Sequence, residues 1–144
     1  LHALQLMVLI IRPAALAAAA RFTREELDEL TDRFTSPGSV YLADIQEAVL
    51  KHTTLEPLYV ILSETNHLLE WGHHFAYYPS KRHTLSHLNK KAITALRQLY
   101  EGNASSFADG MADCYRYILI CMKKNMVEKY KFHNVANIRV PEKY

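Results

Sequence analysis

The chain has 144 residues, of which 49% are hydrophobic, so it is long enough for one domain that needs neither disulfides nor a structural metal. Its 17 basic and 15 acidic residues give a net charge of +2, and the charges alternate along the sequence, which argues against a nucleic-acid-binding surface. Cys114 and Cys121 are seven residues apart on one expected helix, about 10 Å along its axis and too far for a disulfide, so free thiols and a cytoplasmic protein are expected.

Two helices are expected in the first 33 residues. The apolar, alanine-rich run from Leu4 to Arg21 predicts a core helix. A signal peptide is disfavoured because no basic start precedes the run and Arg12 interrupts it, and the interrupted run is too short for a membrane span. Thr23 followed by Glu26 forms a capping-box pattern, so a second helix should begin at Thr23.

Four more helices are expected after a loop at 35–39. Residues 40–52 predict a short amphipathic helix, and residues 55–78 predict a long core helix around which the other helices pack, because apolar residues recur in it at helical spacings. Residues 85–102 predict a helix that ends at Gly102, and Asn103 should cap the last helix, which runs to about Lys131. The predicted fold is therefore an all-α, antiparallel bundle of about six helices.

The last helix carries two adjacent apolar stripes, so it should contact several neighbouring helices or a second subunit. The stripes are Phe107, Met111, Cys114, Ile118, Cys121 and Tyr115, Leu119, Met122, Met126. Residues 132–144 show no helical period and predict an extended tail after a helical domain at 1–131.

Four segments of the chain are informative when taken in order: IIRPAALAAAARFTREELDEL, EPLY at 56–59, GHHFAYYP at 72–79 and AITALRQLYEGNASSFADGM at 92–111. Together they resemble the effector-binding C-terminal domain of GntR-type transcription regulators of the FadR subfamily. The resemblance covers nearly all of 4–126 and implies a helical bundle that dimerises and holds a small effector in its interior. It also implies an N-terminal winged helix-turn-helix that reads operator DNA, and no such domain lies in these 144 residues. Effector binding would change operator affinity by a population shift.

Many relatives in this family hold a metal with an Asp-x-x-x-His pair and two further histidines. Here the pair falls on Ala43 and Glu47, or one residue earlier on Leu42 and Gln46; the later positions fall on Asn89 or Lys90 and on Cys114. Because this set lacks the histidines, we expect no metal and no cofactor. The chain then resembles the metal-free, fatty acyl-CoA-sensing branch, and the effector should be a fatty acyl or carboxylate compound.

Five residues are candidates for ligand binding. Arg12 matches the family's first-helix arginine and needs an anion, which is either a ligand or a structural partner such as Asp44. The other candidates lie on inward helix faces, where a structural role is the alternative for each: Gln46, Asn89, Cys114 and Tyr115.

No catalytic set is recognisable, so an enzyme is not expected. His83 and His87 are four residues apart but face away from the apolar stripe, which predicts exposed side chains. Two functions remain open: an effector-binding, homodimeric regulator domain, or a helical interaction module with a filled core and no small-molecule ligand. An internal cavity bearing Arg12 or Asn89 would favour the first.

Overall fold

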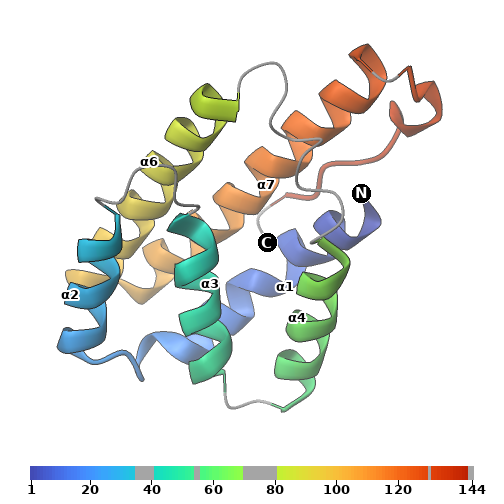
Figure 1. Cartoon of the computed structure of the whole chain (residues 1–144). Coiled ribbons are helices and arrows are strands. Elements are labelled where there is room, and N and C mark those ends of the chain that lie inside the picture. Colours follow the sequence, from blue (N-terminus) through green and yellow to red (C-terminus); the bar gives the residue numbers. More distant parts are fainter. Residues whose placement is uncertain (35–40, 54–55, 70–80, 130, 143–144) are drawn as a thin grey trace.

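The structure is a computed structural model that describes residues 1–34, 41–53, 56–69, 81–129 and 131–142 (Figure 1). These residues form helices and no strand, which confirms the predicted all-α bundle. The helices are α1 (His2–Ala19), α2 (Arg24–Arg33), α3 (Tyr41–His52), α4 (Glu56–Leu69), α6 (Lys81–Tyr100) and α7 (Ala104–Glu128), followed by a short 3-10 helix, η1 (His133–Val135). The expected loop at 35–39 and the expected helix end at Tyr78 lie outside the described residues.

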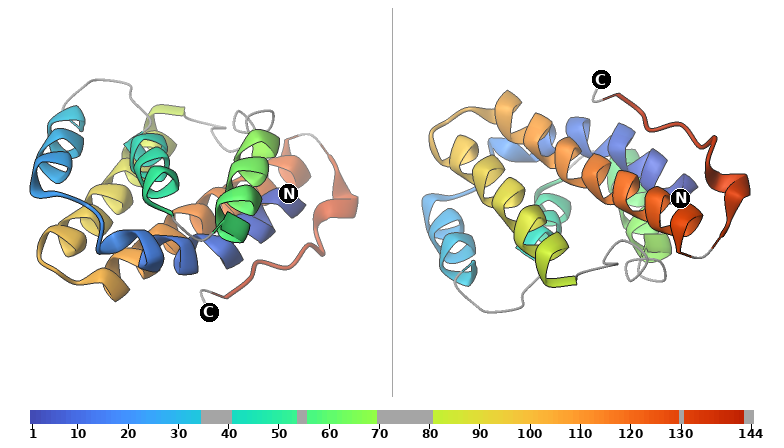
Figure 2. Two further views of the ribbon diagram at one scale, coloured as in Figure 1. Left: turned by 90° about the horizontal axis from the view of Figure 1, so that it is seen from below. Right: turned by 90° about the horizontal axis from the view of Figure 1, so that it is seen from above.

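Helices α1 and α7 lie side by side and antiparallel at the centre of the bundle (Figures 1 and 2). Arg12 of α1 pairs with Asp109 near the start of α7, and Gln5 near the start of α1 reaches the tail that follows α7. The inward face of α1 is almost completely buried; it consists of Leu4, Met7, Val8, Ile11, Ala14, Ala15 and Ala18. Small alanine side chains let the neighbouring helix approach closely, so this face is both apolar and tightly packed.

The expectation that the first apolar run is too short for a membrane span is wrong, because helix α1 is long and apolar enough to cross a membrane when only its length and composition are considered. Its apolar face packs in the bundle core instead, and it continues through Pro13, which lies on the exposed side of the helix. It is therefore a core helix in this fold, as the sequence predicts.

Helices α6 and α7 form a hairpin around Gly102. The N–H of Gly102 donates to the Leu99 carbonyl at 3.0 Å, and the N–H of Asn103 donates to the Gln98 carbonyl at 2.8 Å. Gly102 adopts φ +83°, a left-handed conformation that favours glycine, so the predicted helix end is confirmed. Asn103 holds the N-cap position of α7, but its side-chain amide donates to the Gln98 side chain instead of capping the helix.

The prediction that residues 55–78 form the organising core helix is wrong for the part that the structure describes. Helix α4 packs on α1, and only Leu62 and Thr65 among its described side chains are buried. Val60 and Ile61 are 54% and 41% exposed. The apolar period fixes one inward face, but among the described residues no helix covers the neighbouring apolar residues of α4.

The two stripes of α7 are covered within the chain. Helix α1 packs along one side of α7 and α6 along another, so Phe107, Met111, Ile118 and Leu119 are buried without a second subunit. The first of the two predicted alternatives, contact with several helices, therefore accounts for the wide apolar face. A homodimer stays a prediction that rests on the family resemblance.

The tail turns back after α7 and runs beside α7 and the start of α1 (Figures 1 and 2). Lys131 takes a left-handed φ of 61° at the turn, and the side chain of Gln5 donates to the Arg139 carbonyl at 2.7 Å. Arg116 of α7 donates to the Pro141 carbonyl at 3.2 Å, and Val140 packs against the core. Apart from η1, the described tail is non-helical, as predicted.

Candidate functional site

Arg12 is held by protein groups. Its Nε donates to Asp109 Oδ1 at 2.7 Å, and its Nη2 lies 3.5 Å from the hydroxyl of Ser105. The suggestion that Asp44 is its structural partner is wrong, because Asp44 lies 3.8 Å from Arg33. The prediction that Arg12 needs an anionic partner is met by Asp109, which is 97 residues away, and no local sequence pattern marks that partner.

Asn89 joins α6 to α3. Tyr41 is the first residue of α3, and its backbone N–H donates a hydrogen bond to the side-chain oxygen of Asn89 at 3.0 Å. The first N–H groups of a helix have no partner within the helix, so this side chain caps α3 from a neighbouring element. The inward position predicted for Asn89 thus has a structural use.

Cys114 and Tyr115 are buried in α7, as predicted. Burial raises the pKa of the Cys114 thiol to about 12, so it stays protonated and unreactive at neutral pH. Cys121 is half-buried, and burial raises its thiol pKa too. Both are free thiols that belong to the packing of α7.

Gln46 is the predicted ligand-binding residue that has a buried polar atom without a hydrogen-bond partner among the described residues. It lies in the middle of α3 and is only 6% exposed, yet its side-chain nitrogen has no hydrogen-bond partner among the described residues. Buried polar groups in folded proteins are nearly always paired, with protein, water or a ligand. The Gln46 amide therefore offers a buried donor inside the bundle.

Hollows that open to solvent include four that lie among the described residues, and none of the five predicted residues lines any of these four. A groove of about 510 Å³ lies between α6 and α7, over the close approach of Ala95 and Gly110. A groove of about 350 Å³ separates α2 from α3, one of about 360 Å³ separates α7 from the tail, and one of about 230 Å³ separates α2 from α6. The predicted residues thus lie in separate environments and not around one of these hollows.

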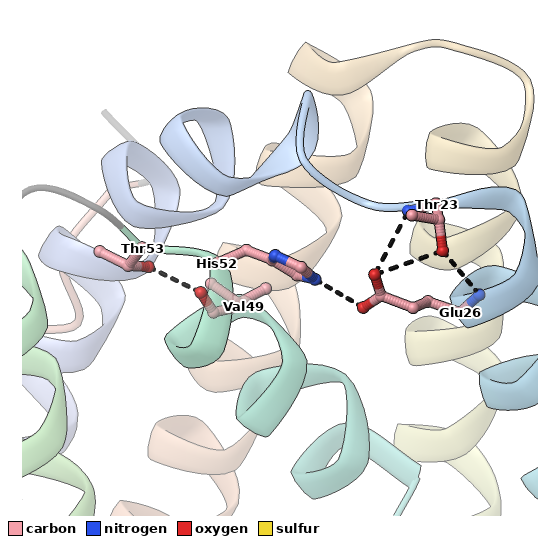
Figure 3. Close-up of polar contacts among 5 residues, drawn as sticks. All are labelled: Thr23, Glu26, Val49, His52 and Thr53. Carbon is pink, nitrogen blue, oxygen red and sulfur yellow. Dashed lines mark hydrogen bonds and ion pairs between the residues drawn. The ribbon is translucent and has the colours of Figure 1, made fainter.

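A hydrogen-bonded contact between Glu26 of α2 and His52 of α3 was not predicted from the sequence (Figure 3). His52 Nε2, in the last turn of α3, lies 2.5 Å from Glu26 Oε2, and Glu26 also completes the capping box with Thr23. The ring of Phe22 lies against that of His52, with centroids 4.9 Å apart. The capping box itself is confirmed. The contact of the Glu26 carboxylate with His52 was not predictable from local sequence, because it forms only when the fold places α3 beside α2.

The Glu26 carboxylate makes the free energy of unfolding depend on pH in the acid range. Its side-chain hydrogen bond with His52 lowers the Glu26 pKa from the ordinary value. A glutamate with a lowered folded-state pKa stabilises the fold above its unfolded pKa, and this contribution disappears as the pH falls through the folded-state pKa. We expect Glu26→Gln, which preserves the capping box, to destabilise the protein by at most about 1 kcal/mol at pH 7, and by progressively less as the pH falls below about 4.

Urea unfolding at several pH values measures this effect. Glu29→Gln, an exposed glutamate on the same helix, is the matched control and should show no comparable pH-dependent difference. A Glu26→Gln difference that is constant from pH 7 to pH 3 would contradict the assignment.

Metal-binding side chains do not gather in the described part of the chain. Within the described ranges, no three His, Cys, Asp or Glu side chains form a group that could hold a metal ion. His83 and His87 are exposed, as predicted, with ring centroids 6.3 Å apart. The expectation of a metal-free domain stays a prediction.

No protein-family model, curated protein or solved structure matches this chain. The resemblance to FadR-type effector domains therefore rests on the order and spacing of the quoted segments.

Proposed function

We propose that this chain is the ligand-sensing, dimerising domain of a cytoplasmic transcription regulator of the GntR/FadR type. It binds a small acidic or acyl effector and passes its state to a DNA-binding domain outside these 144 residues. It uses no metal or cofactor and catalyses no reaction. The family part of the proposal is supported by the quoted segments, and the ligand part by Gln46.

The buried amide of Gln46 is the single observation that carries the ligand proposal. A side chain that is 6% exposed and lacks a partner for its nitrogen among the described residues costs stability unless something accepts its hydrogen bond. A carboxylate or an acyl carbonyl is an acceptor of the required kind. The surrounding α3 side chains Leu42, Ile45 and Val49 are apolar, which suits the acyl part of such a ligand.

Helix α3 is also placed to transmit binding. Asn89 of α6 holds its first residue, and Glu26 of α2 holds its last residue, His52. A ligand that contacts the middle of α3 acts on a helix fixed to a different neighbour at each end. A small shift of α3 would therefore change how α2 and α6 are held, which links the proposed ligand site to both neighbouring helices.

Calorimetric titration tests the ligand proposal. We expect dodecanoyl-CoA to bind the wild type more tightly than the short dicarboxylate succinate, because apolar burial contributes about 25 cal/mol per Å². Gln46→Leu should weaken binding about two- to tenfold, since the amide and the thioester carbonyl are both neutral and a hydrogen bond between neutral groups contributes about 0.5–1.5 kcal/mol.

Two controls accompany the titration. Gln98→Leu, on the half-buried outer side of α6, should leave binding unchanged. The stability of Gln46→Leu should equal or exceed that of the wild type, because the variant removes an unpaired buried amide. Equal affinity of wild type and Gln46→Leu for dodecanoyl-CoA would refute the role of Gln46.

The second candidate is a helical interaction module without a small-molecule ligand. It is favoured by Arg12 and Asn89, the two residues expected at an internal cavity, because each has a protein partner. It is favoured too by exposed apolar side chains on α1 and α4, namely Leu6, Leu9, Tyr59, Val60 and Ile61. Absence of binding by both titrated ligands, together with concentration-dependent self-association, would select this function.

A further inference from the structure

The groove between α7 and the tail combines an apolar surface with positive charge. Its α7 side includes Ile120, Lys123, Lys124 and Val127, which lie at helical spacings of three, four and seven from Ile120 and share one face, and Glu128 at the end of the helix. Ile120 is 42% exposed, a high value for an isoleucine in a packed helical domain. The face is therefore an apolar strip with a lysine on either side.

The tail forms the opposite wall. Ala136 and Val140 line the groove, and Val140 is anchored because it packs against the core. The hydrogen bonds from Gln5 to the Arg139 carbonyl and from Arg116 to the Pro141 carbonyl tie this wall to α1 and α7. Both walls are thus built by the fold, and the space of about 360 Å³ between them falls in the range of small-molecule sites, about 300–1,000 Å³.

The charges in the groove select an anion. Neither Lys123 nor Lys124 forms an ion pair with any residue that the structure describes. Glu128 is the acidic residue in the described lining of the groove, and it lies one helical turn beyond Lys124, on the same side of the strip as Lys124. Lysine stems can lie along an apolar surface while their ammonium groups reach an anionic head group at its edge.

We propose that this groove binds a free single-chain anionic amphiphile, such as a fatty acid. The alkyl chain lies along Ile120 and Val127 against Val140, and the carboxylate lies at Lys123 and Lys124. The site is on the surface of the domain, separate from Gln46, and does not depend on the regulator proposal. Charge complementarity favours an anionic amphiphile over a cationic or uncharged one, because only an anionic head group can pair with the ammonium groups of Lys123 and Lys124.

Nuclear magnetic resonance with dodecanoate tests the site. A dodecanoate analogue that carries a nitroxide on its chain should broaden the methyl signals of Ile120, Val127 and Val140, and leave those of the buried Leu88 sharp. Dodecyltrimethylammonium, which has the same chain and a cationic head, should fail to displace it. The double variant Lys123→Gln, Lys124→Gln should bind dodecanoate about tenfold more weakly, the effect of losing hydrogen bonds to a charged group.

Control variants separate binding in this groove from a general effect of charge and from binding at Gln46. Lys90→Gln with Lys91→Gln makes the same charge change in the α6–α7 groove and should leave binding unchanged. Gln46→Leu should leave it unchanged too, so loss of dodecanoate binding in that variant would overturn the surface site and support the interior one. Lys90 and Lys124 are exposed and Lys91 and Lys123 are half-buried, so circular dichroism of each variant checks that the fold is intact.

Three results would overturn the proposal. One is equal broadening at the exposed apolar residues Leu6, Leu9 and Val60, which would mean non-specific adsorption. Another is binding to phosphatidylglycerol vesicles without binding of monomeric dodecanoate, which would make the face a membrane contact. The third is a shift of the Ile120 and Val140 methyl signals on raising the protein concentration alone, which would place a second copy of the chain in the groove.

Discussion

Ile11→Ala should lower the free energy of unfolding by about 2–5 kcal/mol, the range for deleting a fully buried aliphatic side chain. Ile11 is 0% exposed on the face of α1 that packs against α7, so its removal leaves a cavity at the centre of the bundle. Ile61→Ala is the matched control, because the same atoms are removed from a side chain that is 41% exposed on α4. That variant should change stability by less than about 0.5 kcal/mol.

Urea unfolding of the two isoleucine variants measures which helices organise the fold. A large effect at Ile11 and a small one at Ile61 would agree with a core centred on α1 and α7. Equal losses at the two positions would instead restore α4 to the central place that its apolar period predicts.

Gly110→Ala should destabilise the protein even though alanine is the better helix former. A Cβ atom on Gly110 would lie 2.7 Å from the Cβ and 3.2 Å from the Cα of Ala95, so α6 and α7 would have to move apart. Overpacking costs about 1–3 kcal/mol and the helix propensity of alanine returns up to about 1 kcal/mol, so we expect a net loss of about 1–2 kcal/mol.

A double-mutant cycle checks the cause of that loss. Ala95→Gly in the Gly110→Ala background makes room for the new methyl group, so the two changes should be coupled by about 1 kcal/mol or more. Additive effects of the two substitutions would show that the Gly110 contact with Ala95 does not limit the approach of the two helices.

The helices themselves were largely predictable because their signals are local. The capping box at Thr23, the break at Gly102 and the apolar period of α3 each depend on residues within one or two turns, and each is confirmed. The centre of the fold was not predictable in the same way. The face of α1 at Ala14, Ala15 and Ala18 is only weakly hydrophobic, yet these alanines are fully buried because their small size permits close packing.

Gly110 had a sequence signal that could have been used. An isolated glycine inside a helical pattern costs stability and commonly marks a close contact. The residue that it meets, Ala95, lies on another helix and could not be identified from spacing alone.

The polar residues show the same limit. The inward phases of Gln46, Asn89, Cys114 and Tyr115 were predicted correctly, since phase is a property of one helix. The partners of the predicted polar residues were not predicted. The Arg12 contact with Asp109 and the Asn89 contact with Tyr41 join residues 97 and 48 positions apart. Sequence reasoning therefore selected polar side chains near the core, and the fold determined which of them were already paired.

The most direct measurement of the ligand proposal is the side-chain amide signal of Gln46 in ¹⁵N nuclear magnetic resonance during titration with dodecanoyl-CoA. Gln5 and Gln98, whose side chains bond to other parts of the chain, provide internal reference signals. The proposal predicts that the Gln46 amide shifts strongly and saturates with the ligand while the Gln98 amide stays in place. Saturable binding that leaves the Gln46 amide unmoved would contradict it.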